Sequence, residues 1–276
     1  MARELNWDSV IAEAESDDAS VDLACAALLF ALVEYPDLDI DHELSLLDSL
    51  AAGAALRLGD NRETIFAINT LSEYLFDEVG LQGNTDEYYD PRNSYLNQVL
   101  KRQLGIPITL SLVYLEVGKR LGIPLVGIGM PGHFLLRHRD ETGLFVDPFN
   151  RGILLSEEEC AQRLTEITQS HLDWDANYLV PISNREYIAR MLRNLKGIYL
   201  QQRNFSQALS IMDHLVQVQP DASAELRDRG LVKHRLGMKP EAAEDFAKYL
   251  ETAPLDHDSE ELRRLLLQIQ DSTGED

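Results

Sequence analysis

Cysteine is scarce in this 276-residue chain, which contains only Cys25 and Cys160. Two thiols so far apart in the sequence form neither a disulfide framework nor the short ligand spacing of a structural zinc site. The histidines show no spacing that is typical of metal ligands. We therefore predict that the protein holds no metal ion and no other cofactor.

Long apolar runs are absent as well. The chain has no uninterrupted stretch of about 18 apolar residues, and a membrane-spanning helix needs roughly that many. The start of the chain, from Met1 to Asn6, has no apolar stretch behind a basic leader, which is the pattern of a secretory signal. These absences predict a cytoplasmic protein without a membrane span.

Positive charge is in short supply, because 25 Lys and Arg face 47 Asp and Glu and give a net charge of −22. Such a surface repels phosphate at long range, so direct binding to nucleic acid or to anionic lipid is not expected. The same surplus of acid favours solubility and a partner with a basic patch.

The remaining composition is that of an ordinary globular protein, with 45% hydrophobic and 26% charged residues. Apolar residues recur at helical spacing over residues 21–32, 44–58 and 64–79, which predicts three helices. A further helix is expected from Pro107 to about Leu121, with Gly122 in the left-handed position after its end.

The pattern then changes to short apolar runs bounded by glycine or proline, which indicates strands. The predicted strands cover residues 125–130, 133–137, 143–147 and 153–155. Ser156 followed three residues later by Glu159 has the spacing of a capping box, so another helix is predicted to begin there. The middle of the chain is thus expected to be a helix followed by a small antiparallel sheet.

From Asn184 onward the sequence is helical throughout and contains an internal repeat. An offset of 34 residues matches Leu192 with Leu226, Ala208 with Ala242, Met212 with Phe246, Val216 with Leu250 and Pro220 with Pro254. That period is the length of a tetratricopeptide unit. Two such repeats and a capping helix near residues 259–269 are therefore predicted.

Two segments in the middle of the chain carry the most chemical information. One is Gly-Ile-Pro-Ile-Thr-Leu-Ser at residues 105–111, and the other contains His133 in Pro-Gly-His-Phe-Leu and Asp147 in Asp-Pro-Phe-Asn. A helix, a histidine strand and an aspartate strand in this order resemble the core of the transglutaminase-like fold. In that fold a cysteine at the helix start is the nucleophile, the histidine completes an ion pair with it, and the aspartate orients the histidine. The resemblance places Pro107 at or beside the cysteine position.

The sequences of these segments, together with Asn-Ser-Tyr-Leu at residues 93–96, are similar to motifs of the bacterial SirB family. The resemblance covers nearly the whole chain and implies an α+β protein in two parts. Residues 1–180 would form a helical amino-terminal region and a papain- or transglutaminase-like core with a small antiparallel sheet. Residues 181–276 would form all-α tetratricopeptide-like repeats with a capping helix.

Proline suits the first turn of a helix, because its missing N–H has no partner there, but it cannot act as a nucleophile. No catalytic residue is therefore expected, and Pro107, His133 and Asp147 are interpreted as the positions of a lost triad. Thr109 and Ser111 are alternative nucleophiles, which would need His133 within hydrogen-bond reach. Their other interpretation is a hydroxyl that bonds a carbonyl one turn earlier.

A cleft floored by the histidine and the aspartate is predicted to bind a peptide or a small group. The predicted binding residues are Asn93, Asn97, Arg102, His133 and Asp147. The segment from Asp86 to Asp90 has two adjacent tyrosines between acidic residues. It is interpreted either as a recognition loop near this cleft or as an ordinary solvated turn.

Three functions remain open from the sequence. The leading hypothesis is a non-catalytic interaction or scaffold protein whose cleft and repeats bind a protein or peptide partner. The second is a hydrolase or acyltransferase that uses Thr109 or Ser111 with His133 and Asp147. The third is a regulator that acts on transcription only through protein partners, because a pI near 4.6 argues against direct DNA reading.

Overall fold

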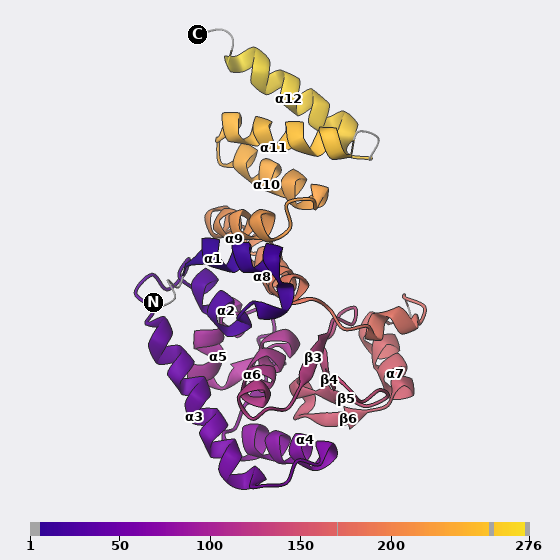
Figure 1. Ribbon diagram of the computed structural model, residues 1–276. Helices are drawn as coiled ribbons and strands as arrows, with labels where there is room; N and C mark the ends of the chain where they lie inside the picture. Colours follow the sequence, from indigo (N-terminus) through magenta and orange to yellow (C-terminus); the bar gives the residue numbers. More distant parts are fainter. Residues whose placement is uncertain (1–5, 170, 254–256, 274–276) are drawn as a thin grey trace. The chain divides into compact units, whose positions relative to one another are not determined.

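The computed structural model describes residues 6–169, 171–253 and 257–273 of the chain (Figure 1). The chain divides into two compact units, Met1–Met191 and Leu192–Asp276, and each has its own hydrophobic core. The division falls inside helix α8 (Asn184–Gln201). A domain boundary between residues 180 and 181 stays a prediction. The α+β fold class with helical repeats is confirmed.

The amino-terminal part of unit 1 is helical, with α1 (Trp7–Ser16), α2 (Leu23–Ala31), α3 (Ile40–Leu58) and α4 (Thr64–Ser72). Helix α4 continues into a π-helical segment, Glu73–Glu78. Every residue of α2 is buried, as expected for a helix that is apolar on all sides. Helices α2 to α4 confirm the three predicted helices. Helix α1 was not predicted, although its apolar residues recur at helical spacing; the stripe is short, and only Val10 is buried.

A short parallel pairing precedes the central helix. Strand β1 (Gln82–Gly83) pairs with β2 (Leu104–Gly105), and helix α5 (Leu96–Arg102) lies between them in the sequence. Two-residue strands have no periodicity, so the sequence did not predict them. The pairing brings the segment after β1 to the start of the central helix, where the Asn84 N–H donates to the carbonyl of Gly105 at 2.9 Å.

Helix α6 (Pro107–Arg120) is the central helix of unit 1, and most of its residues are buried. Pro107 occupies its first turn, as predicted. The Thr109 hydroxyl accepts a hydrogen bond from the Ile106 N–H at 3.1 Å and donates to the carbonyl of Asn93 at 2.7 Å. These bonds satisfy a donor that a helix start otherwise leaves unpaired, and they tie α6 to the segment before α5.

The predicted sheet is present as four antiparallel strands in the order β3 (Leu125–Ile128), β4 (Leu135–His138), β5 (Phe145–Asp147) and β6 (Ile153–Leu155). Figure 1 shows this sheet between α6 and helix α7 (Glu157–Thr168). Alternate side chains of the strands form a core with α7, and this core includes Ile128, Leu135, Phe145, Leu155, Cys160 and Leu164. The predicted capping box of α7 is confirmed. The sheet is therefore held between two helical layers.

The amino-terminal segment returns to the carboxyl end of unit 1. The two carboxylate oxygens of Asp18 accept hydrogen bonds from the N–H groups of Asn184 and Arg185, each at 2.7 Å. The Asn184 side chain donates back to the carbonyls of Asp18 and Val21. Asp18 thus caps α8 from 166 residues away, which the sequence alone could not reveal.

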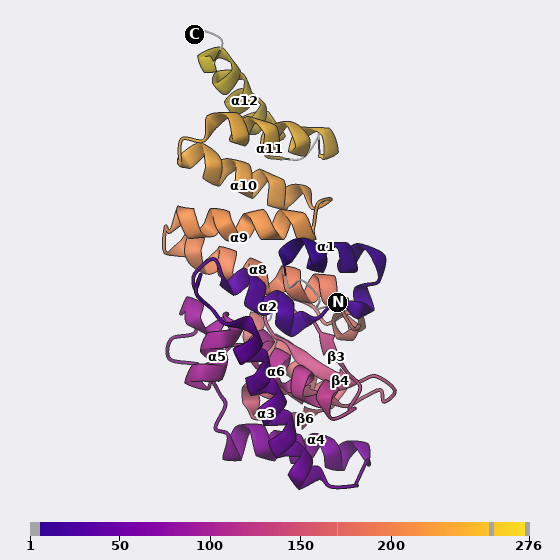
Figure 2. The ribbon, with the colours of Figure 1, turned by 60° about the vertical axis from the view of Figure 1, so that its left-hand side comes forward.

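Unit 2 consists of the remainder of α8 followed by α9 (Phe205–Val218), α10 (Ser223–Arg235), α11 (Lys239–Thr252) and α12 (Ser259–Thr273). Figure 2 shows α9, α10 and α11 lying side by side. Helices α9 and α11 begin and end 34 residues apart, which confirms the predicted repeat. Helix α12 follows as the predicted capping helix, while Pro254 lies outside the described residues.

The residues matched by the repeat occupy matching places in the packing. Ala208 and Ala242 are both fully buried, and Met212 and Phe246 follow one turn later, also buried. Gly230 of α10 permits the closest approach, since a Cβ there would lie 2.6 Å from a ring carbon of Phe246. Small residues therefore stand where neighbouring helices touch, as the repeat pattern indicates.

Candidate functional site

Two predicted site residues meet where strand β4 begins and β5 ends. His133 lies in a turn just before β4, with its N–H bonded to the carbonyl of Met130 at 3.1 Å; the sequence had placed it on the strand itself. Asp147 is the last residue of β5. Because β4 and β5 are antiparallel neighbours, these ends lie together, and His133 Nε2 is 2.9 Å from Asp147 Oδ2.

The carboxylate of Asp147 is fully buried, and His133 is only 6% exposed. Asn150 adds two bonds, from its N–H to Oδ1 at 3.2 Å and from its side-chain amide to Oδ2 at 2.7 Å. Burial raises the pKa of Asp147, but the hydrogen bond and charge of His133 and the bonds from Asn150 outweigh it and keep that pKa below its usual value. The hydrogen bond between Nε2 and the carboxylate fixes the orientation of the imidazole ring.

Aromatic rings cover one side of His133. The ring centroids of Phe149 and His133 are 6.1 Å apart and nearly perpendicular, and Tyr88 contacts Phe149 at the same separation. Phe149 fits there because Gly83 has no side chain, and a Cβ would lie 2.7 Å from its ring. Arg190 holds the backbone on the other side, where Nη2 donates to the His133 carbonyl at 3.2 Å. The imidazole is therefore fixed by its neighbours as well as by Asp147.

Two predicted binding residues fasten the loop that carries Tyr88. Asn93 is fully buried, and its amide donates to the carbonyls of Glu87 at 2.7 Å and Tyr88 at 3.3 Å. Arg102 donates to the side-chain oxygen of Asn93 at 3.3 Å and reaches Asp90 at 3.5 Å. Asn93 and Arg102 thus set the course of the loop from which Tyr88 reaches the rings beside His133.

Asn97 is the fifth predicted binding residue, and it differs from Asn93 and Arg102. It is 5% exposed, and among residues 6–169, 171–253 and 257–273 its Oδ1 has no hydrogen-bond partner. Leaving a buried acceptor unsatisfied costs about 1–3 kcal/mol. Asn97 therefore retains an unused acceptor and remains a predicted binding residue.

The first turns of α6 contain the predicted nucleophile positions. Pro107 is buried and has no group that could attack a carbonyl carbon. The Thr109 hydroxyl is fully buried and bonded to Asn93 and Ile106, which confirms that it bonds to the backbone. The hydroxyl of Ser111 is also buried, but within the described chain it has no hydrogen-bond partner. Only Ser111 therefore keeps an uncommitted hydroxyl.

The two cysteines lie in cores. Cys25 is one of the buried residues of α2. Cys160 is fully buried in the core between the sheet and α7. Burial raises the pKa of the Cys160 thiol to about 12, with further increases from Asp147 and from Glu159 and Glu157. At neutral pH this thiol is protonated, and the reactive form of a cysteine is the thiolate.

In the described ranges, no three or more His, Cys, Asp or Glu side chains gather in a way that could hold a metal ion. No helix in the same ranges combines the length and the apolar character needed to cross a membrane.

A histidine–aspartate pair on a small antiparallel sheet that packs on a central helix agrees with comparisons to known proteins. A model of the transglutaminase-like superfamily matches residues 41–193. The chain belongs to this superfamily. A tetratricopeptide repeat model matches residues 195–267. Unit 1 is accordingly the transglutaminase-like unit, and unit 2 is the repeat unit.

Similar proteins are found in bacteria and in animals. A UPF0162 protein of Xylella fastidiosa (strain 9a5c) is 38% identical over 271 residues, which cover 95% of this chain and 94% of that protein. The UPF0162 protein YchA of Escherichia coli (strain K12) is 29% identical and covers 87% of this chain and 88% of that protein. The F-box only protein 21 of Homo sapiens is 25% identical over 81% of this chain but only 35% of that protein. No solved structure matches the chain.

Sequence reasoning missed three residues of the transglutaminase-like site. Asn150 could have been found, because an aspartate followed three residues later by a bonded N–H is the spacing of a cap. Phe149 lies in the same quoted motif, but only the contact with His133 gives its place. No sequence motif indicated Arg190, since it reaches the His133 carbonyl from 57 residues away. Local spacing therefore indicated the near partners and not the distant one.

Proposed function

We propose that this protein is a non-catalytic interaction protein of the SirB type, with a transglutaminase-like unit that has lost its nucleophile. The observation that carries the proposal is the use of the Thr109 hydroxyl. It is fully buried, receives the Ile106 N–H and donates to the Asn93 carbonyl. A hydroxyl committed to these bonds is not available for attack on a substrate.

The surroundings of the cysteine position support the same proposal. In the transglutaminase-like fold the nucleophile stands at the start of the helix, and here Pro107 occupies that turn. Cys160 does not replace it, because burial raises the pKa of its thiol to about 12. The His133–Asp147 pair thus serves to hold the turn before β4 in place, with the imidazole in one orientation.

The edge of this site is suited to contact with a partner. Tyr89 is 63% exposed, and its ring lies 5.3 Å from that of Tyr88, which contacts Phe149 beside His133. Exposed tyrosines give a large contact area at a low cost in conformational entropy. We assign the binding of a peptide or small group to this edge.

The repeat unit supplies the second contact surface. Leu231 of α10 is 40% exposed. Gly197 lies 34 residues earlier at the matching position of α8, and nothing lies within 4 Å of where its Cβ would stand. The first helix of each repeat is therefore open at the same position. A helix or extended segment of a partner that runs across both first helices would contact these two positions.

Ion pairs stiffen these first helices from one repeat to the next. The pairs are Arg193–Glu225, Lys196–Glu225, Lys196–Asp228 and Arg227–Asp258. The partners within each pair are about 30 residues apart, close to the repeat period. A surface that is already ordered loses less entropy when a partner binds.

A second candidate function is acyl transfer or hydrolysis by Ser111. The observation that favours it is the buried Ser111 hydroxyl, which has no hydrogen-bond partner in the described chain. It lies on the same face of α6 as Gly118, seven residues later, where a Cβ would meet Leu125 of the sheet. Ser111 thus faces the sheet that carries His133.

Labelling of the full chain with a fluorophosphonate probe separates the two functions. We expect no added mass on the intact protein, because no activated hydroxyl is present. Stoichiometric labelling that disappears in Ser111→Ala and in His133→Gln, both folded by circular dichroism, would instead establish the hydrolase. Thr109→Val serves as the matched control, since it removes a hydroxyl that the proposal assigns to structure.

The interaction role is tested with substitutions in the full chain. Immobilised wild-type protein is compared with Gly197→Phe and Leu231→Asp by quantitative mass spectrometry of bound proteins. Leu56→Asp is the control, since Leu56 is 85% exposed on α3 of the other unit. We expect one set of partners to be lost from both repeat variants and kept by the control. If all four proteins retain the same set, the repeat surface has no such role.

A further inference from the structure

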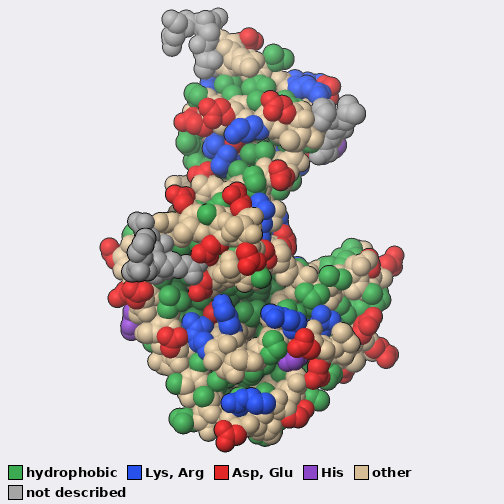
Figure 3. All heavy atoms as spheres, viewed as in Figure 1, with side chains coloured by type: hydrophobic (Ala, Val, Ile, Leu, Met, Phe, Trp, Pro, Cys, Tyr) green, Lys and Arg blue, Asp and Glu red, His purple; other side chains and the backbone are tan. Residues whose placement is uncertain are grey.

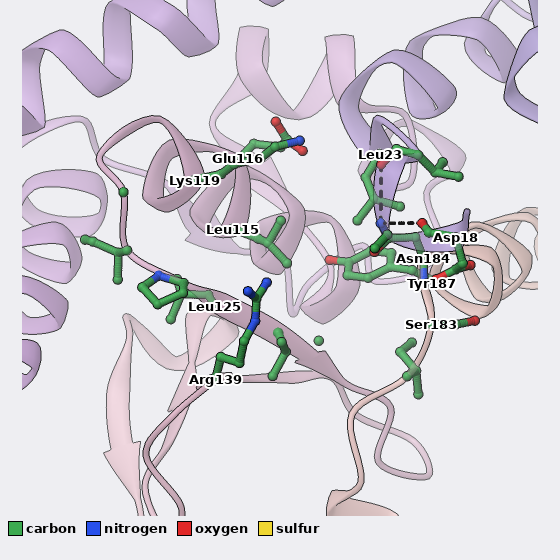
Figure 4. Close-up of a pocket in the computed structure, with 18 residues that line it drawn as sticks. Asp18, Leu23, Leu115, Glu116, Lys119, Leu125, Arg139, Ser183, Asn184 and Tyr187 are labelled. Carbon is green, nitrogen blue, oxygen red and sulfur yellow. Dashed lines mark hydrogen bonds between the residues drawn. The ribbon is translucent and has the colours of Figure 1, made fainter. Parts of the chain in front are cut away.

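A pocket of about 430 Å³ lies within the transglutaminase-like unit, away from the His133–Asp147 pair. Segments far apart in the sequence form it: the turn after α1, the second half of α6, the start of β3, the end of β4 and the segment before α8 (Figure 4). Its volume is in the range of small-molecule sites in proteins. The pocket is therefore large enough for a ligand of its own.

The strand register separates this pocket from the site described above. Leu125 and Arg139 line the pocket at the end of the sheet where Leu125 pairs with His138. His133 precedes the opposite end, where Ile128 pairs with Leu135. The pocket extends along β3 as far as Gly127, but none of the residues that line it belongs to the histidine–aspartate site.

The walls of the pocket are largely apolar. Leu23 comes from α2, Leu115 from α6 and Leu125 from β3, and Figure 4 shows these side chains around one space. Tyr187 of α8 closes one side, with its hydroxyl bonded to the carbonyl of Ile108 at 2.8 Å. Such walls would bury an aromatic or aliphatic body and contribute to binding in proportion to the apolar area covered.

The acidic groups of the pocket already have partners. Both oxygens of Asp18 accept bonds from the first N–H groups of α8. One oxygen of Glu116 accepts from Arg120 at 2.6 Å, and burial raises the pKa of this carboxyl. The negative charge of these two groups is therefore compensated or reduced before any ligand enters.

The basic groups have no such partners. Arg139 points into the pocket in Figure 4, and Lys119 lines it as well. Both side chains are exposed, and within residues 6–169, 171–253 and 257–273 neither takes part in an ion pair or a side-chain hydrogen bond. Both cations are therefore available to a ligand, although the charge of Lys119 also acts on nearby Glu116, whose pKa it lowers.

The wall also retains an unused acceptor. Glu116 is 2% exposed and lines the pocket, and its Oε1 has no hydrogen-bond partner among the described residues. Buried polar atoms are rarely left unsatisfied, and those that remain often mark a place that a ligand or water fills. This acceptor would take a hydrogen bond from a donor group and not from a carboxylate, so it marks an unfilled polar position on the wall without selecting the charge of a ligand.

We propose that this pocket binds a small organic acid with an apolar body. The carboxylate lies between Arg139 and Lys119, and the body lies against Leu23, Leu115 and Leu125. Guanidinium and ammonium groups form charge-assisted hydrogen bonds with a carboxylate, which are stronger than neutral ones. A neutral or cationic molecule of the same shape lacks these bonds.

Isothermal titration of the full chain with three matched probes tests the proposal. The probes are 2-naphthylacetate, the neutral 2-naphthylacetamide and the cationic 2-(2-naphthyl)ethylamine. We expect the carboxylate to bind with a dissociation constant on the order of 1 mM or tighter, and about tenfold more tightly than either analogue. Its affinity should fall as salt is raised, because exposed charges are screened.

Substitutions of residues that line the pocket test whether the carboxylate probe binds there. Arg139→Gln and Lys119→Gln are each expected to weaken carboxylate binding by about five- to tenfold, and both sites are exposed, so the fold is retained. Leu115→Trp fills the pocket and should abolish binding. Lys248→Gln is the matched control, since it removes one positive charge from an exposed position of the repeat unit and should change nothing.

Several results would overturn the proposal. Equal binding of the amide or the amine would show that the two cations do not select the ligand. Equal losses in Lys248→Gln and Arg139→Gln would reduce the effect to net charge. Absence of both heat and thermal stabilisation at millimolar 2-naphthylacetate would mean that the pocket takes no such acid.

Discussion

The two units of this protein differ in how far acidic residues outnumber basic ones. The transglutaminase-like unit carries 14 Lys and Arg against 32 Asp and Glu, and the repeat unit carries 11 against 15, which together give the 25 and 47 of the chain. The repeat unit spreads its charges into ion pairs between neighbouring helices, and Figure 3 shows acidic and basic side chains interspersed over α10 and α11.

The transglutaminase-like unit has two helices that are largely buried in its core. All nine residues of α2 are buried, as are eleven of the fourteen residues of α6. Some of its acidic groups form ion pairs, such as Glu78 with Arg57 and Asp48 with Arg120, while Asp18 and Asp22 cap helices. The difference between the units is therefore one of charge balance: acids exceed bases by 18 in the larger unit and by 4 in the repeat unit, so most of the acids without a basic counterpart belong to the unit with the larger core.

The largest effect is expected from the core of the repeat unit. Phe246→Ala removes a fully buried ring that packs on Gly230, and such truncations cost about 3–5 kcal/mol. Both tryptophans, Trp7 and Trp174, belong to the other unit. Thermal melts followed by circular dichroism should therefore shift, while the tryptophan fluorescence transition stays in place.

The matched control for this experiment is Leu267→Ala, at a residue of α12 that is 58% exposed. It should leave both signals close to wild type. An equal shift of the circular dichroism and fluorescence transitions in Phe246→Ala would mean that the two units unfold together, and the energetic contrast between them would be lost.

The next effect concerns the ion pairs. Asp245 is 1% exposed and bonds Arg229 at 2.6 Å and Lys233 at 2.8 Å. Asp245→Asn removes the charge that both cations share, although Arg229 keeps its bond to Asp213, and it should cost about 3 kcal/mol, measured by circular dichroism at pH 7. Glu244→Gln, an exposed neighbour on α11, is the control and should change stability little.

The same carboxylate predicts a dependence on pH. Burial raises the pKa of Asp245, but the bonds and charges of Arg229 and Lys233 outweigh it and lower that pKa below 3.8. Its contribution is present above the unfolded value of 3.8 and is lost as the pH falls through the folded pKa. Below pH 4 the wild type should therefore approach the stability of Asp245→Asn. A constant difference between the two down to pH 2 would contradict this.

A smaller effect is expected at the histidine–aspartate pair. Asp147→Asn keeps the shape of the side chain but removes a charged acceptor bonded to His133 and Asn150, which should cost about 2 kcal/mol. Because the pKa of Asp147 is lowered, this difference is present at neutral pH and shrinks as the pH falls below 3.8. Urea unfolding followed by tryptophan fluorescence measures it. An unchanged midpoint at pH 7 would show that the pair contributes nothing to stability.

The smallest effect has the opposite sign. Burial and nearby Asp22 raise the pKa of Glu116, although Lys119 and Arg120 lower it. The ionised form is thus disfavoured in the folded protein, and wild-type stability falls as the pH rises through the folded pKa. Glu116→Gln should gain about 0.5–1 kcal/mol at pH 8 and less at pH 5, measured by urea unfolding. A loss at pH 8 would show that the bond to Arg120 outweighs burial.

Much of the fold could be predicted because the spacing of residues in the sequence indicates it. The 34-residue offset gave α9 and α11, and the capping spacing of Ser156 and Glu159 gave α7. The sequence analysis did not predict helix α1, which is short and in which only Val10 is buried. The pairing of β1 with β2 escaped because two residues are too few to show a period.

The site was predicted in part for the same reason. His133 and Asp147 stand in recognisable motifs, and β4 and β5 bring them to 2.9 Å. The roles of Asn93 and Arg102 in holding the Tyr88 loop depend on contacts that no spacing indicates. The name SirB and the loss of a catalytic cysteine stay predictions, since the relatives are named UPF0162 and F-box only protein 21.

The sequence by itself determined the longer helices from α2 onward, the four-stranded sheet, the repeat period, the surplus of acid and the residues of the histidine–aspartate pair, because each can be read from composition, spacing or a motif. Only the tertiary structure decided that Thr109 bonds the Asn93 carbonyl, that Asp18 caps α8, and that Arg139 and Lys119 meet at one apolar pocket. These contacts join residues that are distant along the chain, and they exist only because the buried apolar surfaces of the helices and the sheet pack in one way.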